Sequence, residues 1–131
     1  DNAADIKHDL IALRAVSQTA KQKAQDSFTD MQHAIDSGNR NALMTAVKQT
    51  TTQIHGLNQK YDAVTLKSAE VTAARERLKE ENNLQIEMGN IILSASPDRQ
   101  RFAELNKKWE NAQKMVEIEM EALRIKANTA S

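Results

Sequence analysis

The chain has 131 residues with 18 basic and 18 acidic side chains, which suits one domain, spanning residues 1–131, around one hydrophobic core. Balanced, interspersed charge offers no electrostatic basis for binding nucleic acid, so we expect no nucleic-acid partner. The lack of cysteine excludes disulfides and thiolate chemistry, and no apolar run is long enough to span a membrane.

Apolar residues recur at steps of three and four along most of the chain. The repeat is clearest in residues 6–35, 43–71 and 102–123. Such spacing places the apolar side chains on one stripe of an α-helix, and a β-strand cannot use it. The sequence therefore predicts an all-α fold of long helices packed side by side.

Two breaks in the repeat predict turns. At residues 37–39, Gly38 suits the left-handed position that ends a helix, and Asn39 suits the N-cap of the next helix. At residues 96–98 we expect Ser96 as an N-cap, Pro97 as the first helical residue and Asp98 in the first turn.

Residues 40–94 allow two interpretations. They contain no proline, and their repeat runs unbroken from Leu43 to Leu78, which favours one continuous helix about 80 Å long. A break near residues 62–67 lacks a capping box, but residues 84–95 are apolar around most of the helix and need several neighbours. We therefore predict an antiparallel up-down-up-down four-helix bundle, with an elongated three-helix protein with a long central helix as the alternative.

In this bundle both predicted turns lie at one end, and large apolar residues meet in layers at each end. At the turn end we expect a layer of Phe28, Met31, Ile35, Leu43, Met44, Val47, Leu84, Met88, Ile91, Ile92, Phe102, Leu105 and Trp109. At the far end we expect a layer of Ile6, Leu10, Leu13, Leu57, Tyr61, Val64, Val71, Leu78, Val116, Met120 and Leu123.

Between these layers the first helix carries only small residues, Ser17, Ala20 and Ala24. We expect the Trp109 indole to fill the gap that they leave, with a Thr or Asn oxygen accepting its N–H. The alternative is a small inter-helix pocket at the same level. Its candidate lining residues are Thr51, Thr52, Asn82 and Asn83.

Catalytic and metal-binding patterns are absent from the sequence. His8, His33 and His55 each lie beside a core position, and no two of them are within one helical turn. The chain also has no glycine-rich phosphate loop and no strained nucleophile elbow. We therefore expect no enzymatic activity, no metal and no cofactor.

The chain begins at Asp1 without a methionine, as a mature exported protein does after loss of its signal peptide. We therefore expect a periplasmic or secreted protein, with an excised domain or a cytoplasmic location as alternatives. Ile11, Leu93 and Ile118 lie off the main apolar stripe, and any that remain exposed would mark a partner surface.

These patterns favour a non-enzymatic, exported helical interaction or adaptor protein that binds another protein, with homo-oligomerisation left open. Two alternatives belong to other classes. One is an extracytoplasmic ligand-sensing four-helix domain, and the other is a secretion-associated chaperone or filament subunit whose apolar stripe is completed by a partner helix.

Overall fold

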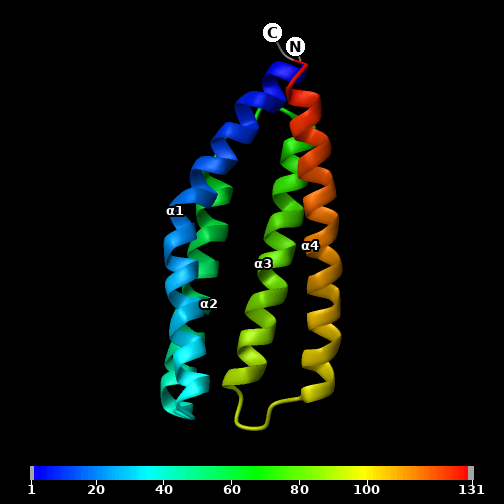
Figure 1. Ribbon diagram of the computed structural model, residues 1–131. Coiled ribbons are helices and arrows are strands. Elements are labelled where there is room, and N and C mark those ends of the chain that lie inside the picture. The colour runs from blue at the N-terminus through cyan, green and yellow to red at the C-terminus, as the bar shows by residue number, and fades with distance from the viewer. Residues whose placement is uncertain (1, 130–131) are drawn as a thin grey trace.

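The computed structural model describes residues 2–129 and shows four antiparallel helices in up-down-up-down order (Figure 1). The helices are α1 (Asn2–Asp36), α2 (Arg40–Ala63), α3 (Ala69–Leu93) and α4 (Arg99–Ala127). The described residues contain no strand, so the predicted all-α four-helix bundle is confirmed. The alternative of a continuous central helix is wrong, because residues 64–68 separate α2 from α3.

The α1–α2 and α3–α4 turns lie together at one end of the bundle, called here the turn end (Figure 1). Gly38 has a φ of 65°, and the Asn39 side chain accepts a hydrogen bond from the Ala42 N–H, as predicted. The second turn differs from the prediction. Asp98, not Ser96, is the N-cap of α4, and its carboxylate accepts the Arg101 N–H at 3.0 Å. A carboxylate both caps the helix and interacts favourably with its dipole.

The α2–α3 connection lies at the opposite end, the closed end, and is held by residues from two other elements. Ser68 caps α3 by accepting the Val71 N–H. From α1, the fully buried Asp9 carboxylate accepts the N–H of Lys67 at 2.9 Å, the N–H of Ser68 at 2.7 Å and the Ser68 hydroxyl at 2.8 Å. Distant contacts thus stabilise a break that local sequence marks poorly.

The ends of α2 and α3 are also joined by an arginine. The Arg75 guanidinium of α3 donates to the carbonyls of Tyr61 and Val64, at 3.2 and 2.7 Å. These carbonyls lie at the end of α2, where a helix has unsatisfied acceptors and favours a cation. Arg75 therefore completes the C-terminus of α2 from the following helix.

The main hydrophobic cluster occupies the closed end. It joins α1 to the last turns of α2 and α4 and to the first turns of α3, as the predicted far-end layer required. Its buried members are Ile6, Leu10, Leu13, Tyr61, Val71, Ala74, Leu123 and Ala127, and Leu57, Leu78 and Met120 pack against them.

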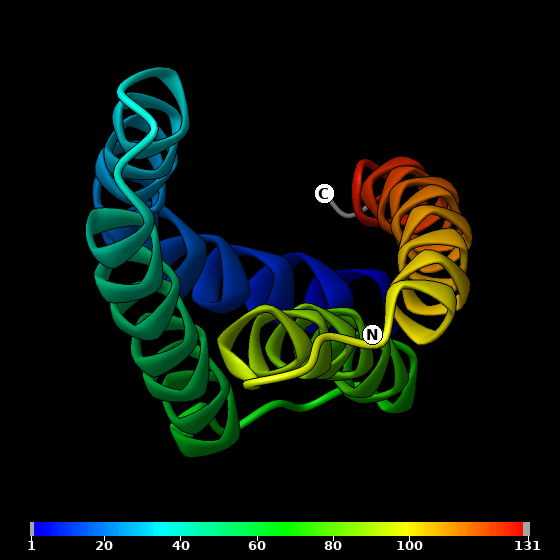
Figure 2. The ribbon, with the colours of Figure 1, turned by 90° about the horizontal axis from the view of Figure 1, so that it is seen from below.

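The turn end does not form the predicted closed layer. Phe28 is 66% exposed and Ile35 is 57% exposed, so their predicted core positions are wrong. The α1–α2 and α3–α4 hairpins diverge there, and within the described residues no Cα atom of α2 lies within 8 Å of one in α4. Figure 2, viewed from the turn end, shows α4 standing apart from the lower parts of α1 and α2.

Candidate binding groove

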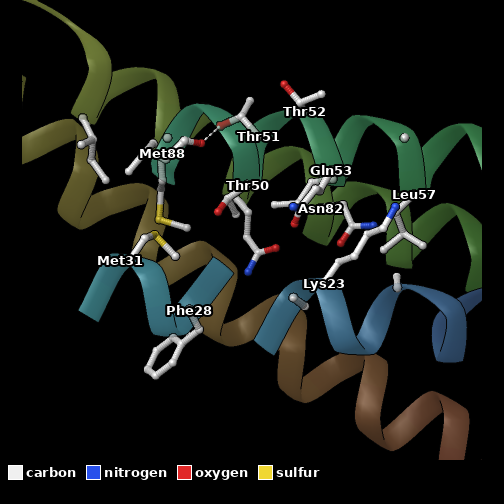
Figure 3. A pocket seen from close by; sticks show the side chains of 18 of the residues that line it. Lys23, Phe28, Met31, Thr50, Thr51, Thr52, Gln53, Leu57, Asn82 and Met88 are labelled. Atoms are coloured by element: carbon white, nitrogen blue, oxygen red, sulfur yellow. Dashed lines mark hydrogen bonds between the residues drawn. The ribbon is translucent and has the colours of Figure 1, made fainter. Parts of the chain in front are cut away.

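The divergence of the two hairpins opens a groove of about 700 Å³ in the turn-end half of the bundle. All four helices contribute to its lining, which is mainly apolar (Figure 3). Its size lies within the roughly 300–1,000 Å³ typical of small-molecule sites. The apolar lining residues include Phe28, Met31, Val47, Ile54, Leu57, Met88, Ile92, Phe102 and Trp109.

The groove changes character along its length. Phe28, Met31 and Met88 lie in the part nearest the turns, whereas Lys23 and Asn82 lie in the part nearest the middle of the molecule (Figure 3). Lys23 extends from α1 across the groove towards α2 and α3 (Figure 3). The end nearest the middle of the molecule therefore carries the Lys23 charge, whereas the labelled side chains nearest the turns, including Thr50 and Thr51, are uncharged.

The back wall of the groove forms where α3 packs closely on α2 around Gly89. The Thr51 hydroxyl donates to the Val47 carbonyl at 2.9 Å, which is the dashed line in Figure 3. A Cβ atom at Gly89 would lie only 2.8 Å from the Thr51 Oγ1. Glycine at this position therefore allows α3 to pack directly against the Thr51 turn of α2.

Amide side chains at the polar end of the groove are held by neighbouring side chains. The Gln53 Oε1 accepts the hydroxyl of the buried Ser27 at 2.7 Å. Asn82 donates to the Asn58 Oδ1 at 2.9 Å, and Asn58 donates in turn to the Asn83 Oδ1 at 3.0 Å. This chain of amides links α2 to α3 beside the groove.

Among the described residues, two lysines are the charged residues of the lining, and no carboxylate lines the groove. The side chains of Lys23 and Lys60 are exposed, and neither makes an ion pair or hydrogen bond within the described part of the chain. Asp26, one turn after Lys23, accepts a hydrogen bond from Gln22 instead. The polar end of the groove is therefore rich in free cationic donors.

Trp109 does not occupy the position that the sequence predicted. The indole is half-buried and lines the groove, whose space stays open beside it. Its Nε1 is buried and has no acceptor among the described residues, so the predicted hydrogen bond to a Thr or Asn oxygen is also wrong. The small residues Ala20 and Ala24 face the groove instead of an indole.

The structure brings together three of the four predicted pocket residues. Thr51, Thr52 and Asn82 line the groove, although the Thr52 side chain points away from the others in Figure 3. Asn83 is exposed and lies outside the lining. Lys23 and Phe28 were missed as lining residues, although the small residues on either side of Lys23 marked the correct level of α1.

The three residues predicted to form a partner surface differ in exposure and lie on three different helices. Ile11 and Ile118 are exposed on α1 and α4, whereas Leu93 is half-buried at the end of α3. Met115 and Ile125 are exposed on α4 as well. Their spacing from Ile118 places all three on one face of that helix, so α4 carries an exposed apolar stripe.

No helix in the described residues combines the length and apolarity that crossing a membrane demands. Over the same residues, no group of three or more His, Asp or Glu side chains is arranged to hold a metal ion.

Comparison with known proteins relates the chain to a protein family. No curated protein and no solved structure matches the chain. Residues 7–129 match the family described as Uncharacterised lipoprotein PM1805. A lipoprotein family indicates an extracytoplasmic or membrane-anchored location, not a cytoplasmic one, and is consistent with an exported protein. Because the match covers nearly the whole chain, the protein belongs to the family Uncharacterised lipoprotein PM1805.

Proposed function

We propose that the protein is a non-enzymatic, extracytoplasmic binding protein that takes an apolar ligand into the groove between its two helical hairpins. The groove itself carries this proposal, since it has the volume of a small-molecule site and an apolar lining from four helices. This function is close to the ligand-sensing alternative drawn from the sequence. The expectation of a purely surface-binding adaptor depended on Trp109 filling the space.

The composition of the lining supports binding over catalysis. Lys23 and Lys60 are its titratable side chains, and over residues 2–129 no carboxylate, histidine or tyrosine lines the groove to act with them. General acid–base and nucleophilic mechanisms use such a second group to activate or orient the first. The groove therefore offers apolar contact and positive charge without a catalytic pair.

The direction of the bundle is compatible with a membrane-anchored role. α1 begins at the closed end (Figure 1). The residues that line the groove belong to the opposite half of the molecule. A lipid anchor attached ahead of α1 would hold the closed end near the membrane. The groove would then lie in the half of the bundle that is farther from the membrane and would remain open to ligands.

The proposal is tested with the neutral dye N-phenyl-1-naphthylamine, whose fluorescence rises in apolar sites. The wild-type protein should bind the dye, and Ala24→Phe should abolish binding, since Ala24 is exposed and lines the groove. Ala15→Phe is the matched control, because Ala15 is exposed on the same helix outside the lining. Absence of binding to the wild type, or equal binding to both variants, would contradict the proposal.

A second candidate function, binding of a protein partner, is favoured by the exposed stripe of Met115, Ile118 and Ile125 on α4. Contiguous exposed apolar residues are typical of interaction surfaces, and this spacing suits one face of a partner helix. A photo-crosslinking residue at position 118 should form a discrete adduct in cells. Position 113, also exposed but about 140° away around the helix, should form none.

A further inference from the structure

We infer that the ligand of the groove is a single-chain anionic amphiphile of the fatty-acid type. Its carboxylate would lie beside Lys23, and its hydrocarbon tail would extend towards the turn end. This inference rests on the proposed binding function of the groove and adds the chemistry and direction of the ligand.

The position of positive charge at one end of the groove carries the inference. Lys23 lies at one end beside Asn82, whereas Met31 and Met88 lie at the other end with the uncharged Thr50 and Thr51 next to them (Figure 3). The helical rise between Lys23 and Met31 gives the uncharged part a length of about 12 Å. A site with this polarity matches a ligand that has one polar head and one apolar tail.

The charge at the polar end selects the sign of the head group. Neither Lys23 nor Lys60 pairs with an acidic side chain among residues 2–129, and Asp26 accepts a hydrogen bond from Gln22. On the other side of the bundle, Glu87 and Glu104 both pair with Arg101 and do not line the groove. A carboxylate beside Lys23 would therefore meet an ammonium group with no ion-pair partner, in a lining whose other charged side chain is also a lysine.

A helix from a partner protein fits these features less well. An α-helix is about 10 Å wide with its side chains, and its backbone acceptors are already paired within the helix. A partner helix would supply an acceptor for Lys23 and Lys60 only if it carried an acidic side chain at the level of these lysines. The acceptor-only head group of a fatty acid uses the free donors directly.

The test compares three ligands with the same chain length below their micelle concentrations: dodecanoate, 1-dodecanol and dodecyltrimethylammonium. Each competes with bound N-phenyl-1-naphthylamine. Dodecanoate should displace the dye at the lowest concentration and the cation at the highest. Lys23→Gln should raise the dissociation constant of dodecanoate about 10-fold, the size of one charge-assisted hydrogen bond, and leave that of dodecanol unchanged.

Lys21→Gln is the matched control, because Lys21 is exposed on α1 and does not line the groove. It should leave all three ligands unaffected. Equal displacement by the three ligands, or equal loss in the two lysine variants, would overturn the inference while leaving the apolar groove intact. Failure of the dye itself to bind would instead contradict the proposed function. A partner helix as the true occupant would show as the absence of displacement by any amphiphile.

Discussion

At the closed end Ile6 and Leu13 of α1 are buried by the three other helices, whereas at the turn end Phe28 and Ile35 of the same helix are more than half exposed. The two ends also differ in how their connections are held. Asp9 and Arg75 bind the α2–α3 connection from α1 and α3, but each turn at the other end joins only its own two helices.

This difference shows how one bundle can combine stability with an open site. Core packing and buried hydrogen bonds at the closed end hold the four helices together, so the two hairpins need not close at the turn end. An open apolar groove costs stability where it occurs. Separating the two ends allows the molecule to tolerate that cost.

The largest expected effect comes from truncating the closed-end core. Leu13→Ala should lower the free energy of unfolding by about 2–5 kcal/mol, because Leu13 is fully buried and its removal leaves a cavity. Phe28→Ala, on the same helix in the exposed groove, should change it by less than about 0.5 kcal/mol. Urea unfolding followed by circular dichroism measures both. Similar losses would mean that the turn end is packed as tightly as the closed end.

Removing the charge of Asp9 should have the next largest effect. Asp9→Asn should cost about 1–3 kcal/mol, since the Lys67 and Ser68 N–H groups lose a charged acceptor in a buried site. Asp30→Asn is the control, because Asp30 is an exposed residue of α1 that makes no contact with the connection. The two variants should differ clearly in their urea midpoints, and equal midpoints would show that Asp9 does not hold the connection.

Substituting alanine for each of two glycines that line the groove should change the stability of the protein in opposite directions. Gly89→Ala should destabilise the protein by about 1 kcal/mol, because its Cβ meets the Thr51 hydroxyl at 2.8 Å and overpacking outweighs the gain in helix propensity. A Cβ atom at Gly56 would meet no other atom within 4 Å, so Gly56→Ala should stabilise the protein by about 0.5–1 kcal/mol.

The double variant Thr51→Ala/Gly89→Ala checks the cause of the Gly89 effect. Removing the Thr51 hydroxyl should recover most of the stability that Gly89→Ala loses. If the double variant is as unstable as the sum of the two single variants, the contact between Thr51 and Gly89 does not explain the loss.

The smallest predicted effect is a dependence of the folding stability on pH in the acidic range. Burial alone raises the pKa of Asp9, but hydrogen bonds from Lys67, Ser68 and His8 outweigh it and lower this pKa below the usual 3.8. The stabilisation by Asp9 is therefore complete above the unfolded pKa near 3.9 and is lost as the pH falls through the lower folded pKa. Burial raises the pKa of Glu81, so the contribution of Glu81 to stability increases, rather than decreases, as the pH falls.

The difference in stability between the wild type and Asp9→Asn isolates Asp9, because Glu81 is present in both proteins. This difference should narrow as the pH is lowered from about 5 towards 2. Thermal unfolding at several pH values measures it. A difference that stays constant over this range would mean that the Asp9 carboxylate is not charged in the folded protein.

The sequence predicted the number and order of the helices because its apolar period and its Gly38 turn are local features. It did not settle the break between α2 and α3, because Asp9 and Arg75 hold this connection from other elements. Ser68 at the N-cap and Glu70 in the first turn are the local features that mark the start of α3. A Ser without a capping box is a weak helix-start pattern.

The groove was only partly predictable for a related reason. The small residues Ala20 and Ala24 marked its level on α1, and Thr51 and Asn82 were placed opposite. Periodicity shows which face of a helix is apolar, but not whether two such faces meet. Phe28 lies on the apolar repeat that predicts core positions. It is nevertheless exposed and lines the groove, because the two hairpins diverge at the turn end.

Amide hydrogen exchange along α1 tests the difference between the two ends most directly, because one helix passes through both. Amides of residues 6–13 should exchange only through global unfolding, and those of residues 24–35 should exchange faster through local opening. The contrast should persist in the absence of any ligand. Uniformly slow exchange along the whole of α1 would contradict an open turn end and, with it, the groove as the binding site.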